Sequence, residues 1–198
     1  MLEMPILITK RLLIRPFVMD DLLDVYQLLD VELNAADLGT DKMDSLAERA
    51  EWLQWAVRNP AQLAKLNQPP YGDRAIIHRS ENKLIGACGY VPCLGFFEQL
   101  HRFSAQSQPP SASHNSTEFG LFYAISPDYQ HQGFATEAAQ ALIDYAFKHL
   151  HLKRIVAETD YTNIGSIRVM QKRGMRLEKN PYPEPPWLQV VGVLENTQ

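Results

Sequence analysis

Cysteine is scarce in this sequence, which contains two among its 198 residues. Cys88 and Cys93 fall within or beside an expected strand. Two cysteines make a weak disulfide framework for a chain of this length, and they lack the neighbouring ligands that a zinc site requires. We therefore expect two reduced thiols and no metal site.

Long apolar runs and an excess of positive charge are also missing. No stretch approaches the roughly 18 apolar residues of a membrane-spanning helix. Met1–Pro5 lacks the basic segment and apolar run that begin a signal peptide. The net charge of -4 argues against binding of nucleic acid on a broad basic face. We expect a cytoplasmic protein that binds neither membranes nor nucleic acid.

The composition that is present is ordinary for a globular protein, with 45% hydrophobic and 21% charged residues. Apolar residues at helical spacing alternate along the chain with strand-like stretches. We expect one α/β (α+β) domain over residues 1–198, with a mixed, mostly antiparallel sheet flanked by helices. The patterns predict strands over 12–15, 73–79, 83–91, 117–125, 154–159 and 188–194, and helices from Asp20 onward and over 45–59, 134–150 and 164–173.

Two segments bear on where the expected helices and strands end. Ser45 and Glu48 fit a capping box at the start of the second helix, and Pro60 is expected to end it. Residues 94–116 begin with apolar side chains and continue into a tract of Ser, Gln, Pro and His. We interpret them as a loop insertion between two strands, mobile in its second half, because neither flank contains a complete core.

The segment from Gln130 to Ala135 lies between an expected strand and the strongest expected helix. The first N–H groups of a helix have no partner within it, and the helix dipole adds partial positive charge. Gly133 lets a ligand approach the backbone closely, and the small Ala135 keeps the next turn open. The loop has neither a Walker motif nor a Gly-x-Gly-x-x-Gly motif. Alone, it predicts either a diphosphate site or simply a glycine that eases a turn.

Five segments, in order, resemble the RimJ/RimL-like branch of the GNAT superfamily of acetyltransferases. One of them, Gln130–Glu137, matches the branch's Q/R-x-x-G-x-G/A-T-E signature. Their joint occurrence across nearly the whole chain is more specific than any single motif. The other segments are Thr9–Phe17, Lys83–Gly89, Glu118–Ile125 and Asn163–Met175.

The resemblance implies acetyl-CoA as cosubstrate and a split sheet. The halves of such a sheet part after the Glu118–Ile125 strand, and the pantetheine arm lies in the gap. The CoA contacts of the family map onto the end of this strand, onto the following loop and onto the start of a later helix. These positions are Tyr123, Ala124, Ile125, Gln130, His131, Gln132, Gly133, Phe134, Ala135 and Asn163.

Glu118 is the candidate general base. An α-amine, with a pKa of about 7.7–8.0, is roughly a tenth neutral at pH 7, whereas a lysine near 10.4 must overcome about 4.6 kcal/mol. A base therefore matters most for acceptors of high pKa. Glu118 shares a strand face with Gly120, beside which a substrate can enter, and similar family members have an acid there. The alternative is a structural acid that holds a neighbouring loop.

Two further residues have a candidate role and a simpler alternative, and a third role belongs to the backbone. Ser166 is a candidate proton donor to the CoA sulfur, or a solvent-facing serine on a helix. Asn163 is a candidate CoA contact, or only the N-cap of its helix. A backbone N–H near Ala124 is the expected oxyanion donor, because the sheet is expected to split there.

The leading hypothesis is an N-acetyltransferase in which a primary amine attacks acetyl-CoA directly in a ternary complex. The acceptor is a protein N-terminus or a small amine, and a homodimer is one option for its assembly. The alternative is a catalytically silent module that binds acyl-CoA and serves regulation. The presence of Glu118 favours the enzyme.

Overall fold

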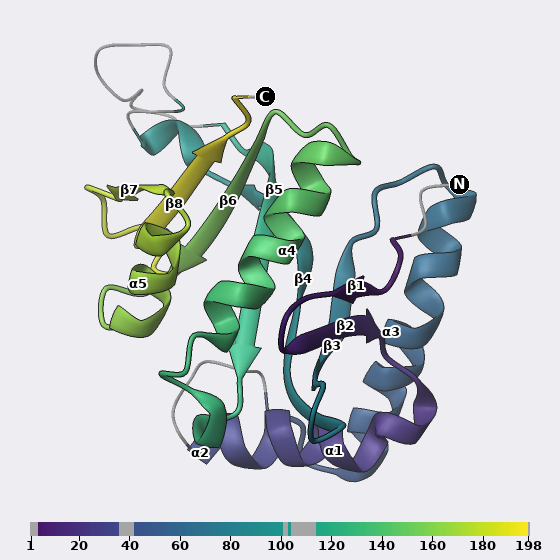
Figure 1. Ribbon diagram of the computed structural model, residues 1–198. Coiled ribbons are helices and arrows are strands. Elements are labelled where there is room, and N and C mark those ends of the chain that lie inside the picture. The colour runs from purple at the N-terminus through teal and green to yellow at the C-terminus, as the bar shows by residue number, and fades with distance from the viewer. Residues whose placement is uncertain (1–3, 36–41, 101–102, 104–113, 198) are drawn as a thin grey trace. The chain divides into compact units, whose positions relative to one another are not determined.

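The computed structural model describes residues 4–35, 42–100, 103 and 114–197 (Figure 1). The chain divides into two compact units, the first made of Met1–Tyr90 and Tyr123–Ala141, the second of Val91–Phe122 and Leu142–Gln198. Three elements continue from one unit into the other along the chain. They are β4 (Lys83–Gly95), β5 (Ser116–Ile125) and α4 (Phe134–Lys148).

In the described residues the strands form a mixed sheet of eight in the order β1-β2-β3-β4-β5-β6-β8-β7. The pairs β1–β2, β2–β3, β3–β4, β6–β8 and β7–β8 are antiparallel, and β5 pairs with β6 in parallel. The predicted α+β class with a mostly antiparallel sheet is therefore confirmed.

In the first unit, three strands and the start of β4 form an antiparallel meander. β1 (Leu7–Ile8), β2 (Leu12–Pro16) and β3 (Gly72–His78) precede β4, and the register shifts at Ile76/Ile77. Leu12, Ile14 and Ile76 are fully buried. The predicted strands of this unit are confirmed, with β2 one residue longer at its end because Pro16 pairs with Arg74.

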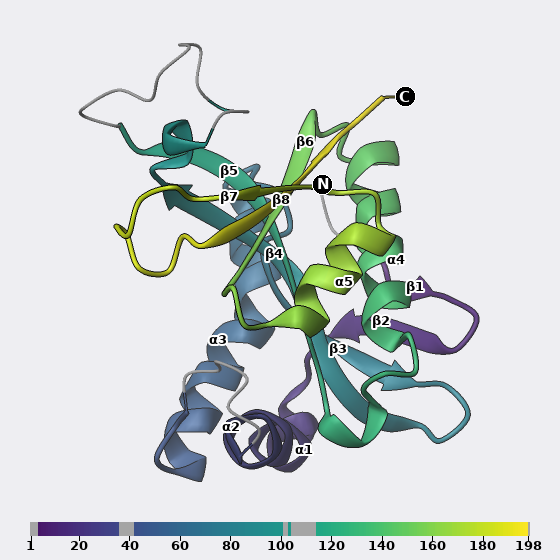
Figure 2. The ribbon, with the colours of Figure 1, turned by 90° about the vertical axis from the view of Figure 1, so that its left-hand side faces the viewer.

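Helices α1 and α3 of this unit lie side by side (Figures 1 and 2). The chain stays helical from Met19 to Ala35, through a 3-10 turn (Met19–Asp21), α1 (Leu22–Tyr26), a π-helical stretch (Gln27–Glu32) and α2 (Leu33–Ala35). Arg49 of α3 holds Asp30 in a buried ion pair with an Nη2–Oδ1 distance of 2.6 Å. Breaking such a pair leaves an uncompensated buried charge, so it fixes how these helices pack.

α3 (Leu46–Lys65) starts where the sequence predicted but ends later than predicted. Ser45 caps it by accepting a hydrogen bond from the Glu48 amide at 3.2 Å. Pro60 does not end the helix, as we expected, but lies inside it. A proline inside a helix removes one hydrogen bond and its ring crowds the carbonyl of the residue four positions earlier, yet the helix continues to Lys65. The following turn is closed by bonds such as that from the Leu66 amide to the Gln62 carbonyl.

In the second unit, β6 (Arg154–Thr159) pairs with β8 (Val190–Glu195), which also pairs with β7 (Arg176–Lys179). The sequence patterns did not predict β7, and β8 starts two residues after its predicted start. α5 (Ile164–Lys172) packs against these strands (Figure 2). Its Met170 contacts the face of β8 at Gly192.

The start of the predicted insertion belongs to the core of the second unit. β4 continues to Gly95 and a 3-10 turn follows at Phe97–Gln99. Phe97 and Leu100 are buried in a cluster with residues of β6 and β8. Most of the segment that we expected to be a mobile loop falls on residues 101–102 and 104–113, outside the described residues. The cluster consists of Phe97, Leu100, Val156, Leu188, Val191 and Val193.

Among the helices of the described residues, none has the length and apolarity to cross a membrane.

Candidate active site

The loop after β5 bends sharply and enters α4 in the first unit. A 3-10 turn at Pro127–Tyr129 precedes it, and His131 and Gly133 have positive φ angles of 59° and 84°. The side chain of Gln130 donates to the Ile125 carbonyl at 3.0 Å, and that of Gln132 donates to the Asp128 carbonyl at 3.0 Å. Both amides thus hold the loop's own backbone. A Cβ atom on Gly133 would lie 3.5 Å from the Arg11 Nη2 atom, so the guanidinium borders this glycine, and the first N–H groups of α4 follow directly after it.

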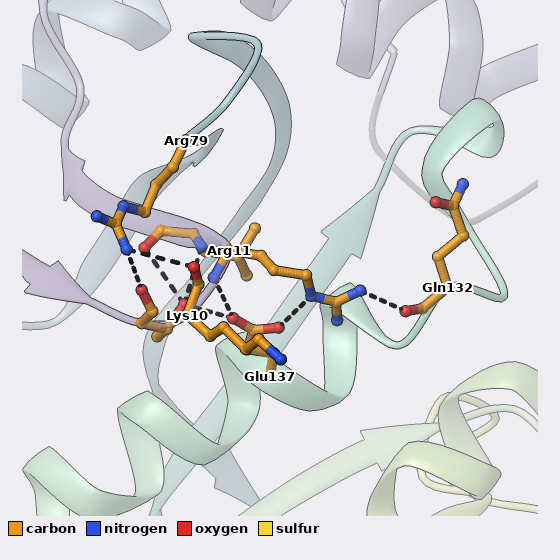
Figure 3. A network of polar contacts seen from close by, with 7 residues as sticks. Lys10, Arg11, Arg79, Gln132 and Glu137 are labelled. Atoms are coloured by element: carbon orange, nitrogen blue, oxygen red, sulfur yellow. Dashed lines mark hydrogen bonds and ion pairs between the residues drawn. The ribbon is translucent and has the colours of Figure 1, made fainter.

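A polar network braces this loop from the hairpin between β1 and β2 (Figure 3). The Arg11 guanidinium donates to the Gln132 carbonyl at 2.9 Å and to Glu137 of α4 at 2.7 Å. Glu137 also accepts from the Thr9 hydroxyl at 2.6 Å and from the Arg11 amide at 2.8 Å. The Arg11 guanidinium lies over the Phe134 ring, 4.1 Å from its centroid. The signature glutamate therefore fixes the first turn of α4 to the turn between β1 and β2.

The electrostatics of Glu137 follow from this network. Burial alone would raise the pKa of Glu137, but the hydrogen bonds from Thr9 and Arg11 and the Arg11 charge outweigh it and lower that pKa. Beside the network, Lys10, Arg11, His78, Arg79 and Ser80 line a pocket of about 360 Å³. Arg79 turns its guanidinium onto the Thr9 carbonyl at 2.7 Å, on the opposite side of the hairpin from the loop (Figure 3).

The end of β5 is held against β4 within the first unit. The Ser126 amide donates to the Ile85 carbonyl at 2.8 Å. A Cβ atom on Gly86 would lie 2.4 Å from the Ala124 carbonyl oxygen, so glycine is required for this close approach. Tyr123, Ala124 and Ile125 thus lead directly into the loop, as predicted from the sequence. The oxyanion role of the Ala124 amide stays a prediction.

Glu118 lies at the start of β5 in the second unit and is engaged by Arg154 of β6. The Arg154 Nε atom donates to Glu118 Oε2 at 2.6 Å, and its Nη2 atom donates to Oε1. These hydrogen bonds raise the pKa of Arg154. The Arg154 guanidinium also lies over the Phe103 ring. The base role of Glu118 stays a prediction, and this ion pair supports the alternative of a structural acid.

The space that we expected beside Gly120 is filled. A Cβ atom on Gly120 would lie 2.2 Å from the Cys93 Sγ atom and 2.8 Å from the Val91 carbonyl oxygen. The glycine therefore admits a side chain of β4 and not a substrate. Both cysteines, Cys88 and Cys93, are free, as predicted. Among the described residues, no three or more His, Cys, Asp or Glu side chains are grouped as a metal would require.

Asn163 and Ser166 come together at the start of α5. The Asn163 Oδ1 atom accepts a hydrogen bond from the Ser166 amide at 3.0 Å, which is an N-cap. Asn163 is therefore a cap in this structure, and its contact with CoA stays a prediction. The proton-donor role of Ser166 also stays a prediction.

Sequence reasoning missed Glu158, a carboxylate on β6. Its Oε1 atom is buried and has no hydrogen-bond partner among the described residues. Burial raises the pKa of Glu158, and a hydrogen bond with Cys93 opposes this only in part. Burial, together with the nearby Glu158 carboxylate, raises the pKa of Cys93 to about 12. In the sequence, Glu158 could have been noticed because it is a glutamate within a short expected strand of apolar and β-branched residues.

A family model described as the acetyltransferase (GNAT) domain matches residues 11–176. The chain belongs to the GNAT acetyltransferase family. The predicted resemblance is thereby confirmed at the level of the family. The match begins at Arg11, which holds the Gln130–Ala135 loop, and ends at Arg176 of β7. It therefore includes this loop and α5.

Curated relatives of this GNAT chain are similar over different lengths. The uncharacterized N-acetyltransferase YoaA of Bacillus subtilis is 29% identical over 88% of this chain and 84% of its own. The spermidine N(1)-acetyltransferase of Escherichia coli is 37% identical over 33% of this chain and 34% of its own. The chain aligns with about a third of the length of YnaD of Bacillus subtilis, at 47% identity over 30% of this chain.

Solved structures share the fold across nearly the whole chain. A GNAT acetyltransferase of Bacillus anthracis has a TM-score of 0.66 at 22% identity, covering 98% of this chain and 100% of its own. The ribosomal-protein-S5-alanine acetyltransferase of Vibrio fischeri has a TM-score of 0.69 at 16% identity, with 98% of both chains covered. At such identities the likeness concerns the fold alone.

Proposed function

We propose that this GNAT protein transfers an acetyl group from acetyl-CoA to a primary amine, by direct attack within a ternary complex. The observation that carries the proposal is the Gln130–Ala135 loop. Its backbone is fixed by its own amide side chains and by Arg11, and Gly133 has a positive φ just before the start of α4. A rigid loop at a helix N-terminus is suited to a diphosphate, and CoA contains one.

The residues present fit acetyl-CoA as cosubstrate. The first N–H groups of α4, a helix of 15 residues, would hold the diphosphate. At the transfer step, Ala124 offers the backbone N–H that we expect to stabilise the developing oxyanion. Ser166 is the proposed donor of a proton to the departing sulfur. Acetyl-CoA supplies the activated acyl group, and the chain binds, orients and moves protons.

The relatives support an amine as acceptor, although they differ in its kind. A relative named for spermidine acetylation points to small polyamines, and a fold neighbour named for acetylation of a ribosomal protein's alanine points to a protein N-terminus. Both acceptors present a primary amine. The proposal therefore specifies the amine class and includes a small amine as well as an N-terminus.

The first experiment measures thiol release from acetyl-CoA with the purified chain and a panel of primary amines of graded pKa. We expect turnover with at least one amine, and saturation with both substrates as a ternary complex requires. Tight binding of CoA without turnover on any amine would instead establish the alternative, a silent acyl-CoA-binding module.

Glu118→Gln tests the proposed base role in the same assay. Removal of a base should slow amines of high pKa most, because these hold their proton most tightly at pH 7. An equal loss for all amines, accompanied by a lower Tm, would assign Glu118 to the ion pair with Arg154. Arg154→Lys is the matched variant, since it weakens the same pair without removing the carboxylate.

A further inference from the structure

Glu158 presents a buried acceptor that lacks a donor. Its Oε1 atom has no hydrogen-bond partner among the described residues, while the residue as a whole keeps some exposure. The Cys93 thiol lies beside it, but this weak donor has a single proton and also lies 3.6 Å from the Val91 carbonyl, to which it donates. A buried carboxylate oxygen without a donor is costly, and such groups commonly mark functional positions. A donor from outside the chain would remove this cost.

The position of Glu158 follows from the pairing of β6. β5 and β6 pair at Gly120 and Val156, and no further pair between these two strands is seen in the described residues. From there β6 continues on β8 alone, where Glu158 lies opposite Val191. Glu158 is thus two residues beyond the point where the parallel pairing stops. At this level β6 is not paired with β5 in the described residues, and the family resemblance expects the acyl chain where the sheet splits.

The side-chain direction of Glu158 is also defined. Alternate residues of a strand point to the same face, so Glu158 shares its face with Val156 and Arg154. This face carries the Phe97 cluster, which includes Val156 and has Cys93 packed against it. The opposite face, at the Gly192 position of β8, is occupied by α5. Glu158 therefore points away from α5.

The charges around Glu158 distinguish it from Glu118. Both oxygens of Glu118 accept hydrogen bonds from the Arg154 guanidinium, so the charge of this carboxylate is already paired. Glu158 has no ion pair among the described residues, and the titratable side chain facing it from β4 is the Cys93 thiol. A cationic amine would be the counter-charge that this carboxylate lacks.

We propose that Glu158 binds the acceptor amine and accepts its proton during acetyl transfer, an inference that rests on the proposed function. The bound ammonium first gives one proton to the Glu158 carboxylate, which passes it to water. The freed nitrogen lone pair then forms a bond to the acetyl carbon, and the C–S bond breaks with its electron pair on sulfur. The second excess N–H proton leaves through Glu158 in the same way, and the sulfur takes up one proton from Ser166, which regains it from water. Burial raises the pKa of Glu158, and an acid whose pKa is raised toward neutrality accepts protons more readily.

The test compares Glu158→Gln and Glu158→Asp with the wild-type chain in the amine assay. Gln keeps the volume and removes the proton acceptor, so kcat/KM for amines of high pKa should fall by about 10²–10⁴-fold. The Kd for acetyl-CoA should stay within about twofold of wild type, because the loop is untouched. Asp keeps the carboxylate and should recover part of the activity. Glu51→Gln, on an exposed position of α3, is the control for loss of one surface charge.

The outcomes separate this inference from the proposed function. A folded Glu158→Gln variant with kcat/KM within about threefold of wild type would overturn the inference and leave the acetyltransferase function standing. If the Gln variant does not fold, Glu158→Asp decides: its loss must grow with the pKa of the amine, and a uniform loss overturns the inference. A wild-type chain that binds acetyl-CoA but turns over no amine overturns both.

Discussion

At the scale of single residues, burial controls the protonation of several side chains in this protein. Asp73 begins β3 beside Gly72, and it lies close enough to Arg49 to be affected by that charge. Burial raises the pKa of Asp73 from 3.8 to about 6, while the Arg49 charge and a backbone hydrogen bond oppose the rise. The folded state therefore binds a proton at Asp73 more tightly than the unfolded state does.

The raised pKa has a defined effect on stability. The stabilisation from protonated Asp73 is present in full below pH 3.8 and is lost as the pH rises through about 6. Asp73→Asn should escape this loss. We expect its free energy of unfolding at pH 7 to exceed that of wild type by about 1–3 kcal/mol, with a much smaller gain at pH 4. Urea unfolding at both pH values measures it.

The exposed Asp160 supplies the control for this measurement. Asp160→Asn removes the same charge from the surface and should change stability equally at both pH values. A gain for Asp73→Asn that is the same at pH 4 and pH 7 would contradict the proposed cause.

The residues that the sequence could predict are those whose role is local. Gly133 and Asn163 are defined by the turn and helix start that immediately surround them, and both lie where the motifs indicate. Glu158 and Asp73 derive their properties from burial among segments distant in sequence. The Gly120 position shows the same limit, because Cys93, from another strand, fills the space beside it. Such contacts depend on strand pairing that no local pattern specifies.

At the scale of elements, the strands and helices with strong periodicity were predicted to within a few residues. α4 and β6 are examples, since their apolar residues recur clearly. α3 was predicted too short because a proline inside a helix can be tolerated when neighbouring hydrogen bonds continue. β7, with the sequence Arg-Leu-Glu-Lys, was missed because charged residues dominate it and its pairing with β8 holds it in place.

The N-cap of α5 allows two roles of Asn163 to be separated. Asn163→Ala removes the acceptor for the Ser166 amide and should cost about 1 kcal/mol of stability. Asn163→Ser retains a capping oxygen and should stay within a few tenths of a kcal/mol of wild type. If Asn163 also binds CoA, Asn163→Ser should still weaken CoA binding by about threefold to tenfold, the value of one hydrogen bond.

Calorimetric titration with CoA and thermal unfolding of both variants measure these effects. Wild-type CoA affinity in Asn163→Ser would limit Asn163 to its role as a cap. Unchanged stability in Asn163→Ala would contradict the cap itself.

At the scale of the whole molecule, the family match spans residues 11–176 and thus parts of both compact units. The chain's net charge of -4 gives no broad attraction for an anionic ligand such as CoA. Affinity for CoA must then come from a local arrangement of N–H groups, which the loop before α4 provides. The stability of the molecule should accordingly respond to CoA through this loop.

Ligand binding to the folded state raises its stability by mass action. At a hundred times its Kd, CoA should stabilise the chain by about 2.7 kcal/mol, which corresponds to roughly 5–11 °C in Tm for this length.

Gly133→Ala should lower the Tm of the free chain, because φ at Gly133 is 84° and a side chain costs about 1–2 kcal/mol there. It should also reduce the shift caused by CoA, since the new methyl group stands beside the first N–H groups of α4, 3.5 Å from the Arg11 Nη2 atom. Gly174→Ala is the matched control: its φ of 74° imposes the same strain, and nothing lies within 4 Å of the added atom. The control should lose Tm and keep the full CoA shift, and a full shift in Gly133→Ala would argue against the loop as the CoA site.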